Sequence, residues 1–292
     1  MNGSVSGITP VVNSQEAKKL ITDITIPPQP QLLVDVRNAY PDLNKVSAII
    51  SQDPAISAGV LKTVNSPFIG LPKKIVRVDQ AVVLLGLDSV INLVNAVQFR
   101  NAFEDLAPDQ LAEFWQNTNA TAMAASILAK HTKLVRTDEA FALGLFRNCA
   151  IPLMQSKFKG YIATLQLAYA DTAGNISQVE KNNYQADHAA ISHLIARAWH
   201  LPASLIQAIA DHHNPKRLAC KGAGDQQQHI DNLCAILKLA EHCTEEYLCY
   251  GNQEADYEWE RHKATLLDHV GLSEEDYLQL CDQISDDIAH NT

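Results

Sequence analysis

Histidines that stand beside carboxylates are the side chains of this sequence best suited to chemistry. His212 and His213 follow Asp211, and His188 follows Asp187. A neighbouring carboxylate can orient an imidazole, as happens when histidines bind metals or carry protons. Adjacent residues on a helix point about 100° apart, so His212 and His213 need not face one centre. The sequence offers candidate ligands, and an ordinary surface or core imidazole is the alternative for each.

Glu241, which stands beside His242 after an apolar run, is a further candidate. The common short signatures are missing: the chain holds no Gly-rich phosphate loop ending in Gly-Lys-Ser/Thr, no G-x-G-x-x-G, no G-x-S-x-G and no H-E-x-x-H. Nucleotide-loop, serine hydrolase and zincin chemistry therefore find no support. Histidine and carboxylate side chains therefore remain as the candidates for chemistry.

The elements that must position these side chains are predicted to be helices. Apolar residues recur at the i, i+3, i+4 spacing, as at Val46, Ile49 and Ile50. Asp53 can cap a helix whose first residue is Pro54. The sequence has no runs of alternating β-branched residues between tight turns, which would predict strands instead of helices. We therefore expect an all-α fold of about a dozen helices.

Several local patterns carry predictions of their own. Ser177-x-x-Glu180 and Ser273-x-x-Asp276 predict reciprocal helix caps. Gly86 is expected to let two helices approach closely, and the polar stretch 220–229 is expected to be an exposed loop. The acidic residues in 254–260 and 274–276 predict a solvated face.

Composition limits the class of protein. The chain has 292 residues, of which 47% are hydrophobic and 19% charged, so it can bury a core. Its 23 basic and 33 acidic residues give a net charge of −10, which disfavours binding to nucleic acid. The longest apolar stretches fall far short of the roughly 20 residues of a membrane span, and residues 1–20 lack a signal-peptide pattern. We expect a cytoplasmic protein that binds neither nucleic acid nor membrane.

Residues 26 to about 245 resemble the HDOD domain, a bacterial signalling relative of the HD-type metal phosphohydrolases. In the first half the resemblance is carried by IPPQP at 26–30, IISQDPAI at 49–56, LKTVNSPFIGLP at 61–72 and QAVVLLGL at 80–87. In the second half it is carried by FW at 114–115, EAFALGL at 139–145, WHLP at 199–202, His188 and the pair at 212–213. The resemblance implies a multi-helix HD-like bundle in two packed helical parts.

The resemblance also implies an organisation of the chain. Residues 1–25 are expected to form a loose tail, and residues 26–245 the HDOD domain, with an N-terminal half at 26–105 and a degenerate HD-like half at 106–245. The segment 101–109 is the expected joint between the halves. Residues 246–292 are expected to form C-terminal helices that pack on the HD-like half.

In active HD phosphohydrolases, the resemblance implies, a His after Phe-Trp, a His-Asp pair, further His residues and a closing Asp hold one or two metals. Here Asn117 stands at the first His, Arg147 and Asn148 replace the pair, and Glu241 lies near the closing Asp. A divalent ion needs anionic or imidazole ligands, whereas a guanidinium is a fixed cation with donors only. We therefore expect no cofactor and no catalytic residue.

The alternative is a divalent transition metal, for which His188, His212 and His213 would be the ligands. The whole residual cleft, a candidate ligand-binding site, consists of Asn117, Arg147, Asn148, His188, His212, His213 and Glu241. A planar guanidinium suits a phosphate or carboxylate, so an anionic small molecule is a candidate ligand. Alternatively, Arg147 pairs with a nearby acid such as Glu139 or Asp187.

The resemblance and the lost dyad together predict a non-catalytic signalling or regulatory module of bacterial signal transduction that works through signalling proteins as partners. A metal-dependent phosphohydrolase acting on a nucleotide or phosphoester is the alternative function. A scaffold with a filled cleft is a third possibility, and it predicts no ligand.

Overall fold

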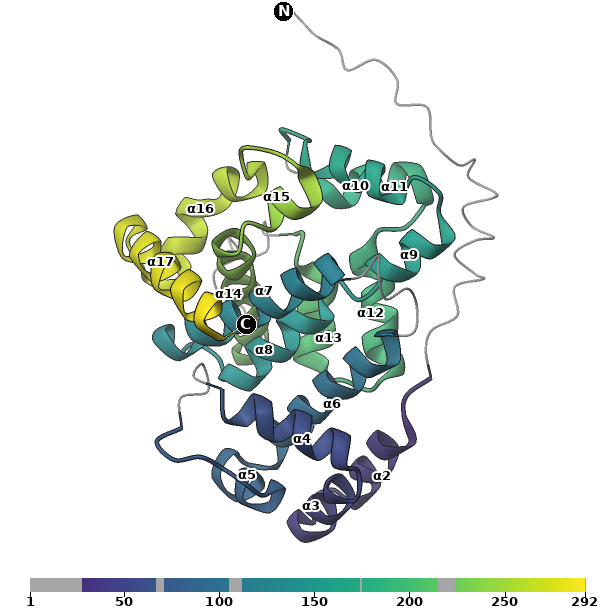
Figure 1. Ribbon diagram of the computed structural model, residues 1–292. Coiled ribbons are helices and arrows are strands. Elements are labelled where there is room, and N and C mark those ends of the chain that lie inside the picture. The colour runs from purple at the N-terminus through teal and green to yellow at the C-terminus, as the bar shows by residue number, and fades with distance from the viewer. Residues whose placement is uncertain (1–27, 67–70, 105–111, 174, 215–223, 292) are drawn as a thin grey trace, which may run out of the picture.

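The computed structural model describes residues 28–66, 71–104, 112–173, 175–214 and 224–291, which fold into helices joined by short connections (Figure 1). Within these ranges no residue is in a strand, and the all-α prediction is confirmed. The helices of the first part are α2 (Gln31–Ala39), α3 (Leu43–Gln52), α4 (Pro54–Val64), α5 (Val78–Leu85) and α6 (Leu87–Glu104). Those of the second part are α7 (Ala112–Thr132), α8 (Thr137–Phe146), α9 (Ile151–Lys157), α10 (Tyr161–Tyr169), α11 (Ile176–Tyr184), α12 (His188–Ala198), α13 (Ala203–Asp211), α14 (Asp225–Cys243), α15 (Glu246–Gly251), α16 (Tyr257–Val270) and α17 (Glu274–Asn291).

Local sequence chemistry sets the boundaries of the N-terminal helices. The Asp53 carboxylate accepts from the backbone N–H groups of Ala55 and Ile56 at 2.9 and 3.0 Å, with Pro54 in the first turn, as predicted. Asn65 ends α4 by donating to the carbonyl of Leu61. The start and the end of α4 are therefore explained by these residues alone.

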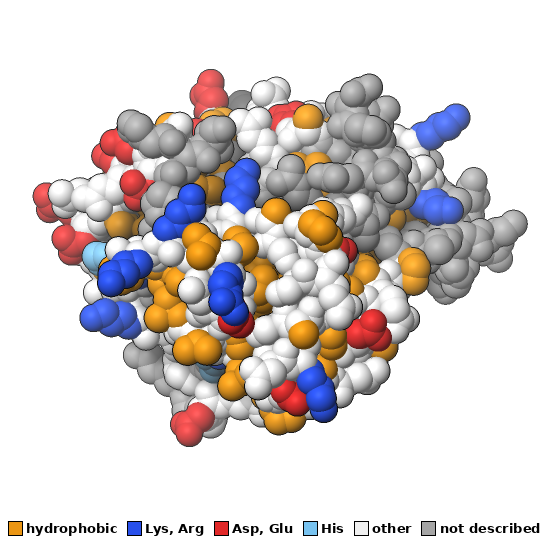
Figure 2. All heavy atoms as spheres, turned by 60° about the horizontal axis from the view of Figure 1, so that its bottom comes forward, with side chains coloured by type: hydrophobic (Ala, Val, Ile, Leu, Met, Phe, Trp, Pro, Cys, Tyr) orange, Lys and Arg blue, Asp and Glu red, His pale blue; other side chains and the backbone are white. Residues whose placement is uncertain are grey.

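Exposed apolar side chains lie on the N-terminal half of the molecule. Val83 is 81% exposed on α5, and Leu84 and Val76 are also more than half exposed. Figure 2 turns this half toward the viewer and shows hydrophobic side chains interspersed with Lys and Arg. The cations nearest in sequence are Lys73, Lys74 and Arg77, all exposed.

Helix α6 joins the two parts, because it contacts α2, α4 and α5 on one side and α8 on the other. Phe99 of α6 packs on Phe146 and Trp199, with ring centroids 4.4 and 5.7 Å apart. Asn92 of α6 donates to the buried Asp138 carboxylate of α8 at 2.9 Å. The segment expected to form the joint is 101–109; its residues 101–104 belong to α6, and 105–109 lie outside the described ranges.

The closest helix pair in the second part is α7 with α8, and a glycine makes it possible. A Cβ on Gly144 would lie 2.5 Å from the backbone Cα of Ala122, far inside van der Waals contact. The glycine therefore lets α8 approach α7. Helix α14 then contacts α7, α8 and α13, and α16 packs on α14 (Figure 1).

Three local predictions were wrong in part or in whole. The stretch expected to be a loop is helical from Asp225, because its Asp and Gln residues suit the exposed first turn of α14. Gly86 has nothing near its missing Cβ and instead takes φ +86° at the end of α5, so backbone conformation is its role. Ser177 lies inside α11, which Asn175 precedes, so it is not a cap.

Two C-terminal features complete the fold. The Ser273 half of the predicted reciprocal cap is confirmed, because Asp276 N–H donates to the Ser273 hydroxyl at 3.0 Å; the Asp276 carboxylate accepts from the same hydroxyl at 2.6 Å. Trp259 of α16 stacks on His242 of α14 with centroids 4.2 Å apart.

None of the helices in the described ranges is both long and apolar enough to cross a membrane.

Candidate functional site

Arg147 follows the last residue of α8 and is completely buried. Its Nε donates to Glu241 Oε1 at 3.1 Å, and its Nη2 donates to Glu246. Burial lowers the pKa of Arg147, but Glu246 and Glu241 outweigh this and hold the pKa above its ordinary value. The guanidinium therefore stays charged, and the acids that neutralise it are neither Glu139 nor Asp187.

Neutral groups complete the shell around the guanidinium. Its Nη2 also lies 3.2 Å from Asn117 Oδ1 and 3.0 Å from the Thr121 hydroxyl, and its Nη1 donates to the Gly144 carbonyl. Asn148 donates from Nδ2 to Glu246 Oε1 at 2.7 Å. Each guanidinium nitrogen thus has an acceptor within the protein.

Lys238 extends this group into a buried ion-pair network. Its ammonium lies 2.7 Å from both Glu241 and Glu258, the latter contributed by α16. The network holds three carboxylates for two cations, Arg147 and Lys238. Burial, opposed by Lys238 and reinforced by Glu246, raises the pKa of Glu241 to about 7. The network therefore holds one more carboxyl group than cations, and Glu241 is the group that can carry a proton near neutral pH.

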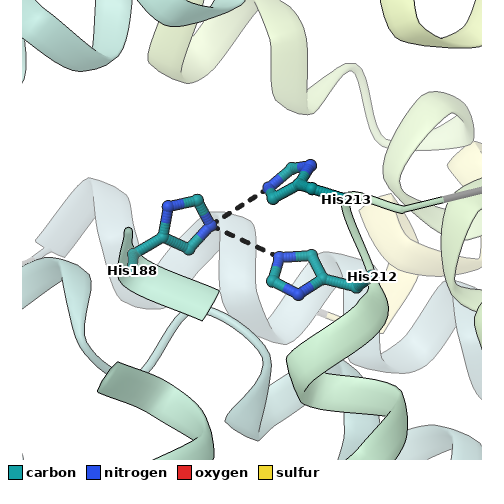
Figure 3. A group of neighbouring side chains, drawn as sticks. All are labelled: His188, His212 and His213. Atoms are coloured by element: carbon teal, nitrogen blue, oxygen red, sulfur yellow. Dashed lines mark hydrogen bonds between the residues drawn. The ribbon is translucent and has the colours of Figure 1, made fainter. Parts of the chain in front are cut away.

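Three imidazoles converge beside this network (Figure 3). His188 opens α12, while His212 and His213 directly follow the last residue of α13. The Nε2 atom of His188 lies 3.3 Å from Nε2 of His212 and 3.0 Å from Nε2 of His213. His188 and His212 are fully buried or nearly so. The turn after α13 thus brings both histidines of the pair to one centre, although their positions in sequence did not require it.

The Nδ1 atoms of the same rings point away from the centre, toward other partners. His188 Nδ1 lies 2.6 Å from Glu180, and His212 Nδ1 donates to the Ile209 carbonyl at 2.7 Å. His213 Nδ1 lies 3.1 Å from Glu258 and 3.2 Å from the Lys238 ammonium. These contacts fix the orientation of all three rings.

Burial and the surrounding cations decide the charge of the imidazoles. Burial, with His213 and His188 nearby, lowers the pKa of His212 well below its ordinary value. Burial and Lys238 lower the pKa of His213 in the same way. Burial also acts on His188, but Glu180 outweighs it and raises the pKa of that ring. His212 and His213 are therefore neutral at neutral pH.

The candidate residues fall into two adjacent groups. Asn117, Arg147, Asn148 and Glu241 belong to the ion-pair network, and the three histidines form the second group. Lys238 and Glu258 join the groups, since both contact His213. A small pocket on the surface leads to the network and is lined by Lys238, Glu241, Glu246, Glu258, Trp259 and Tyr247, among others.

Sequence reasoning missed four of the charged residues that define the site. Glu180 was expected to cap a helix, yet it is buried and bonds Tyr161 and His188. Glu258 was assigned to a solvated face, yet it is only 8% exposed. Lys238 and Glu246 carried no sequence signal, because nothing near them in the chain marks them as buried.

The fold defines the class of protein: an all-helical scaffold of the HD type, in which the resemblance assigns Arg147 and Asn148 to the position of the metal-binding dyad. The family model of the HDOD domain matches residues 26–215, and the chain belongs to the HDOD family.

Solved structures with the same fold cover nearly the whole chain. A candidate phosphohydrolase from Shewanella amazonensis is 25% identical, with TM-score 0.64 over 93% of this chain and 97% of its own. An HDOD domain protein of unknown function from Geobacter sulfurreducens is 18% identical, with TM-score 0.64 over 94% of each chain. A candidate signal transduction protein from Marinobacter aquaeolei is 19% identical, with TM-score 0.62 over 94% of this chain and 63% of its own.

One curated protein is similar to part of this chain in sequence. An uncharacterized protein of Treponema pallidum is 29% identical over 196 residues, which cover 65% of this chain. The match spans 38% of that relative's length.

Proposed function

We propose that this protein is a non-catalytic HDOD module of bacterial signal transduction, which acts by binding signalling proteins. The observation that carries the proposal is the buried pairing of Arg147 with Glu241 and Glu246. It stands at the position that the HD resemblance assigns to the metal-binding His-Asp pair.

Electrostatics explains why this pairing opposes HD-type hydrolysis. A divalent ion at the dyad position would lie against a fixed guanidinium charge and would find no ligand in Arg147. Glu241 could turn to a metal only by leaving Arg147 and Lys238, which would leave each of these buried cations with a single carboxylate partner, Glu246 or Glu258. The residues present therefore do not fit the metal centre of the active HD enzymes.

The same network opposes an anionic ligand at Arg147. Glu241 and Glu246 already occupy the guanidinium, and Glu258 adds a further negative charge to the pocket. An anion would have to displace one of these carboxylates. We therefore expect calorimetric titration with nucleotides and cyclic dinucleotides to give no binding heat.

Partner binding finds support on the N-terminal half. Val76, Val83 and Leu84 are exposed apolar residues, and the exposed Lys73 and Lys74 lie nearby in sequence. Figure 2 shows hydrophobic side chains among Lys and Arg on this half of the molecule. Apolar residues beside cations suit a partner with an amphipathic acidic helix. We propose this face of α5 as the partner surface.

One observation, the convergence of the three histidines, supports the alternative that the protein is a phosphohydrolase. A turnover assay distinguishes this alternative from the non-catalytic function. The full chain, loaded in turn with Fe²⁺, Mn²⁺, Ni²⁺ and Zn²⁺, is incubated with a generic chromogenic phosphodiester. We expect the rate to equal that of the buffer with each metal. Turnover that disappears in His188→Ala and His212→Ala would overturn the non-catalytic assignment.

A further inference from the structure

We propose that a cleft between the two helical parts of the molecule binds a free α-amino acid with an apolar side chain. The cleft has a volume of about 390 Å³ and is lined by residues of α2, α6, the start of α8 and the turn between α12 and α13. None of its lining residues belongs to the Arg147 network or to the three histidines. The inference is therefore separate from the proposed signalling function and from the site that the HD resemblance implies.

The walls of the cleft come from segments that lie far apart in the sequence. Gln29, just before α2, donates from Nε2 to the Trp199 carbonyl at 2.7 Å, and Arg37 of α2 donates to Gln29 Oε1. His200 takes φ +54°, which is unusual for a residue other than glycine, where the chain turns from α12 to α13. Helix α2 also contacts α6 (Figure 1). Concave sites between packed parts of a chain are where small molecules commonly bind.

One buried side chain in the cleft lacks a hydrogen-bond partner. Asn95 of α6 lines the cleft and is only 5% exposed, and no group of the described residues bonds to its side chain. Asn92, one turn earlier and also in the lining, donates to Asp138 at 2.9 Å. A buried carboxamide without a partner is costly, and it offers both N–H donors and a carbonyl acceptor. Asn95 therefore indicates an occupant with polar groups.

The lining also presents charges of both signs. Arg136 is engaged by Asp138, to which its Nε and Nη2 donate at 3.1 Å. Arg37 of α2 and Asp88, in the first turn of α6, have no ion-pair partner in the described part of the chain. A guanidinium suits a carboxylate, and a carboxylate suits an ammonium group. An α-amino acid carries both groups on one carbon atom, so the two charges of the cleft complement a zwitterion.

The apolar part of the lining determines which amino acids fit. Leu33 and Val36 of α2, Ile91 of α6 and Pro202 before α13 supply it. Burial of an apolar side chain against such residues is favourable in proportion to the area removed from water. Ligand pockets span about 300–1,000 Å³, so this cleft lies near the lower end of the range and suits one amino acid instead of a dinucleotide.

Other occupants fit less well. The phosphates of a nucleotide would meet the carboxylates of Asp88 and Glu139, which both line the cleft. Ordered water could satisfy Asn95, but it would gain nothing from the apolar residues of α2 and α6. A saturable ligand that stabilises the folded chain distinguishes an amino acid from water.

The test measures binding of free amino acids to the full chain. The melting temperature is recorded with each of the twenty L-amino acids at millimolar concentration, and L-leucine is then titrated by calorimetry. We expect L-leucine, L-isoleucine, L-valine and L-methionine to raise the melting temperature and glycine and L-aspartate to leave it unchanged. Leucinol lacks the carboxylate and N-acetyl-L-leucine lacks the ammonium group. Each should bind at least about 10-fold more weakly than L-leucine.

Variants assign the binding to the cleft. Asn95→Leu replaces the unpartnered amide with an apolar side chain of similar size, so it should fold at least as stably as the unaltered chain yet bind L-leucine at least about 10-fold more weakly. Arg37→Met and Asp88→Asn, which each remove one charge, should weaken binding to a similar extent. Asp79→Asn is the matched control for Asp88→Asn, because Asp79 also lies in the first turn of an exposed helix start but pairs with Arg77 outside the cleft. It should bind L-leucine as the unaltered chain does.

Three results would overturn the proposal. If no amino acid changes the melting temperature or gives binding heat, the cleft holds only water. Equal affinity for L-leucine in the unaltered chain and in Asn95→Leu would place the ligand elsewhere. Leucinol and N-acetyl-L-leucine that bind as tightly as L-leucine would show that the cleft does not recognise a zwitterion.

Discussion

At the scale of single residues, Arg147 shows how one buried cation can set the electrostatics of a site. Its guanidinium stands where the HD resemblance places a metal ligand, and like a metal ion it needs carboxylates to balance its buried charge. Glu241 and Glu246 supply them. Both carboxylates are thus paired with a cationic side chain of the protein itself.

Removing that cation should be costly. Arg147→Met leaves Glu246 buried without its cation and Glu241 with Lys238 alone, and we expect the free energy of unfolding to fall by about 3–5 kcal/mol. Urea unfolding followed by circular dichroism measures this. Arg77→Met is the control, since Arg77 pairs with Asp79 at the surface and should contribute less than about 1 kcal/mol. Equal effects of the two substitutions would contradict the role of the network.

The raised pKa of Glu241 makes a prediction about pH. Glu241 holds a proton up to about pH 7 when folded and releases it near its ordinary, lower value when unfolded, so in this window the folded chain binds more protons. Its contribution to stability is full below the unfolded pKa and is lost as the pH rises through the folded one. The charged groups that face it are Arg147, Lys238, Glu246 and Glu258.

The difference in unfolding free energy between the unaltered chain and Glu241→Gln separates the effect of Glu241 from the titration of the histidines. We expect the unfolding free energy of the unaltered chain, relative to the variant, to decrease from about pH 5 to about pH 7.5. Urea unfolding at several pH values gives this difference. The exposed Glu254→Gln serves as control and should leave the difference flat. A difference that grows with pH would show that Glu241 is ionised throughout.

At the scale of elements, the contact of α7 with α8 places Arg147. Gly144 lies one turn before Arg147, and its missing side chain lets α8 reach the backbone of α7 at Ala122. Because Asn117 and Thr121 also lie on α7, this approach brings them within reach of the guanidinium. Close packing of two helices is thus a condition for the network.

Gly144→Ala tests that condition. The added Cβ meets backbone and not a movable side chain, so the helices must separate, and we expect a loss of at least about 1–3 kcal/mol. Gly224→Ala is the control, with open space at its Cβ, and should change stability by less than about 1 kcal/mol. Differential scanning calorimetry ranks the two variants. A Gly144→Ala chain with unchanged melting temperature would show that the contact is loose.

The helices were predictable from the sequence to a greater extent than the site. Apolar periodicity and the Asp53 cap depend on residues close in the chain, and both predictions are confirmed. Burial of a charged residue depends on distant partners, so Glu180 and Glu258 were misread. The convergence of His212 and His213 on His188 could not be predicted from the sequence either, because it depends on how α13 packs against α12.

At the scale of the whole molecule, the site depends on chain beyond the family match. The HDOD match ends at residue 215, whereas Glu241, Glu246 and Glu258 all follow it. Helix α14 carries the first, α15 the second and α16 the third. Helix α14 contacts α7, α8 and α13, and α15 and α16 both pack on α14 (Figure 1). The C-terminal helices are therefore part of the site.

Truncation after residue 245 tests this dependence. The shortened chain loses Glu246 from Arg147 and Asn148, loses Glu258 from His213 and Lys238, and loses the packing of α15 to α17 on α7, α10 and α14. We expect it to lose its cooperative thermal transition, because several buried charges lose a partner at a cost of about 3–5 kcal/mol each. Glu246→Gln in the full chain separates charge from packing: it should lower the melting temperature but keep a single cooperative transition. A truncated chain that melts like the full one would mean that the network contributes little to the fold, and that residues 246–292 are an independent appendage.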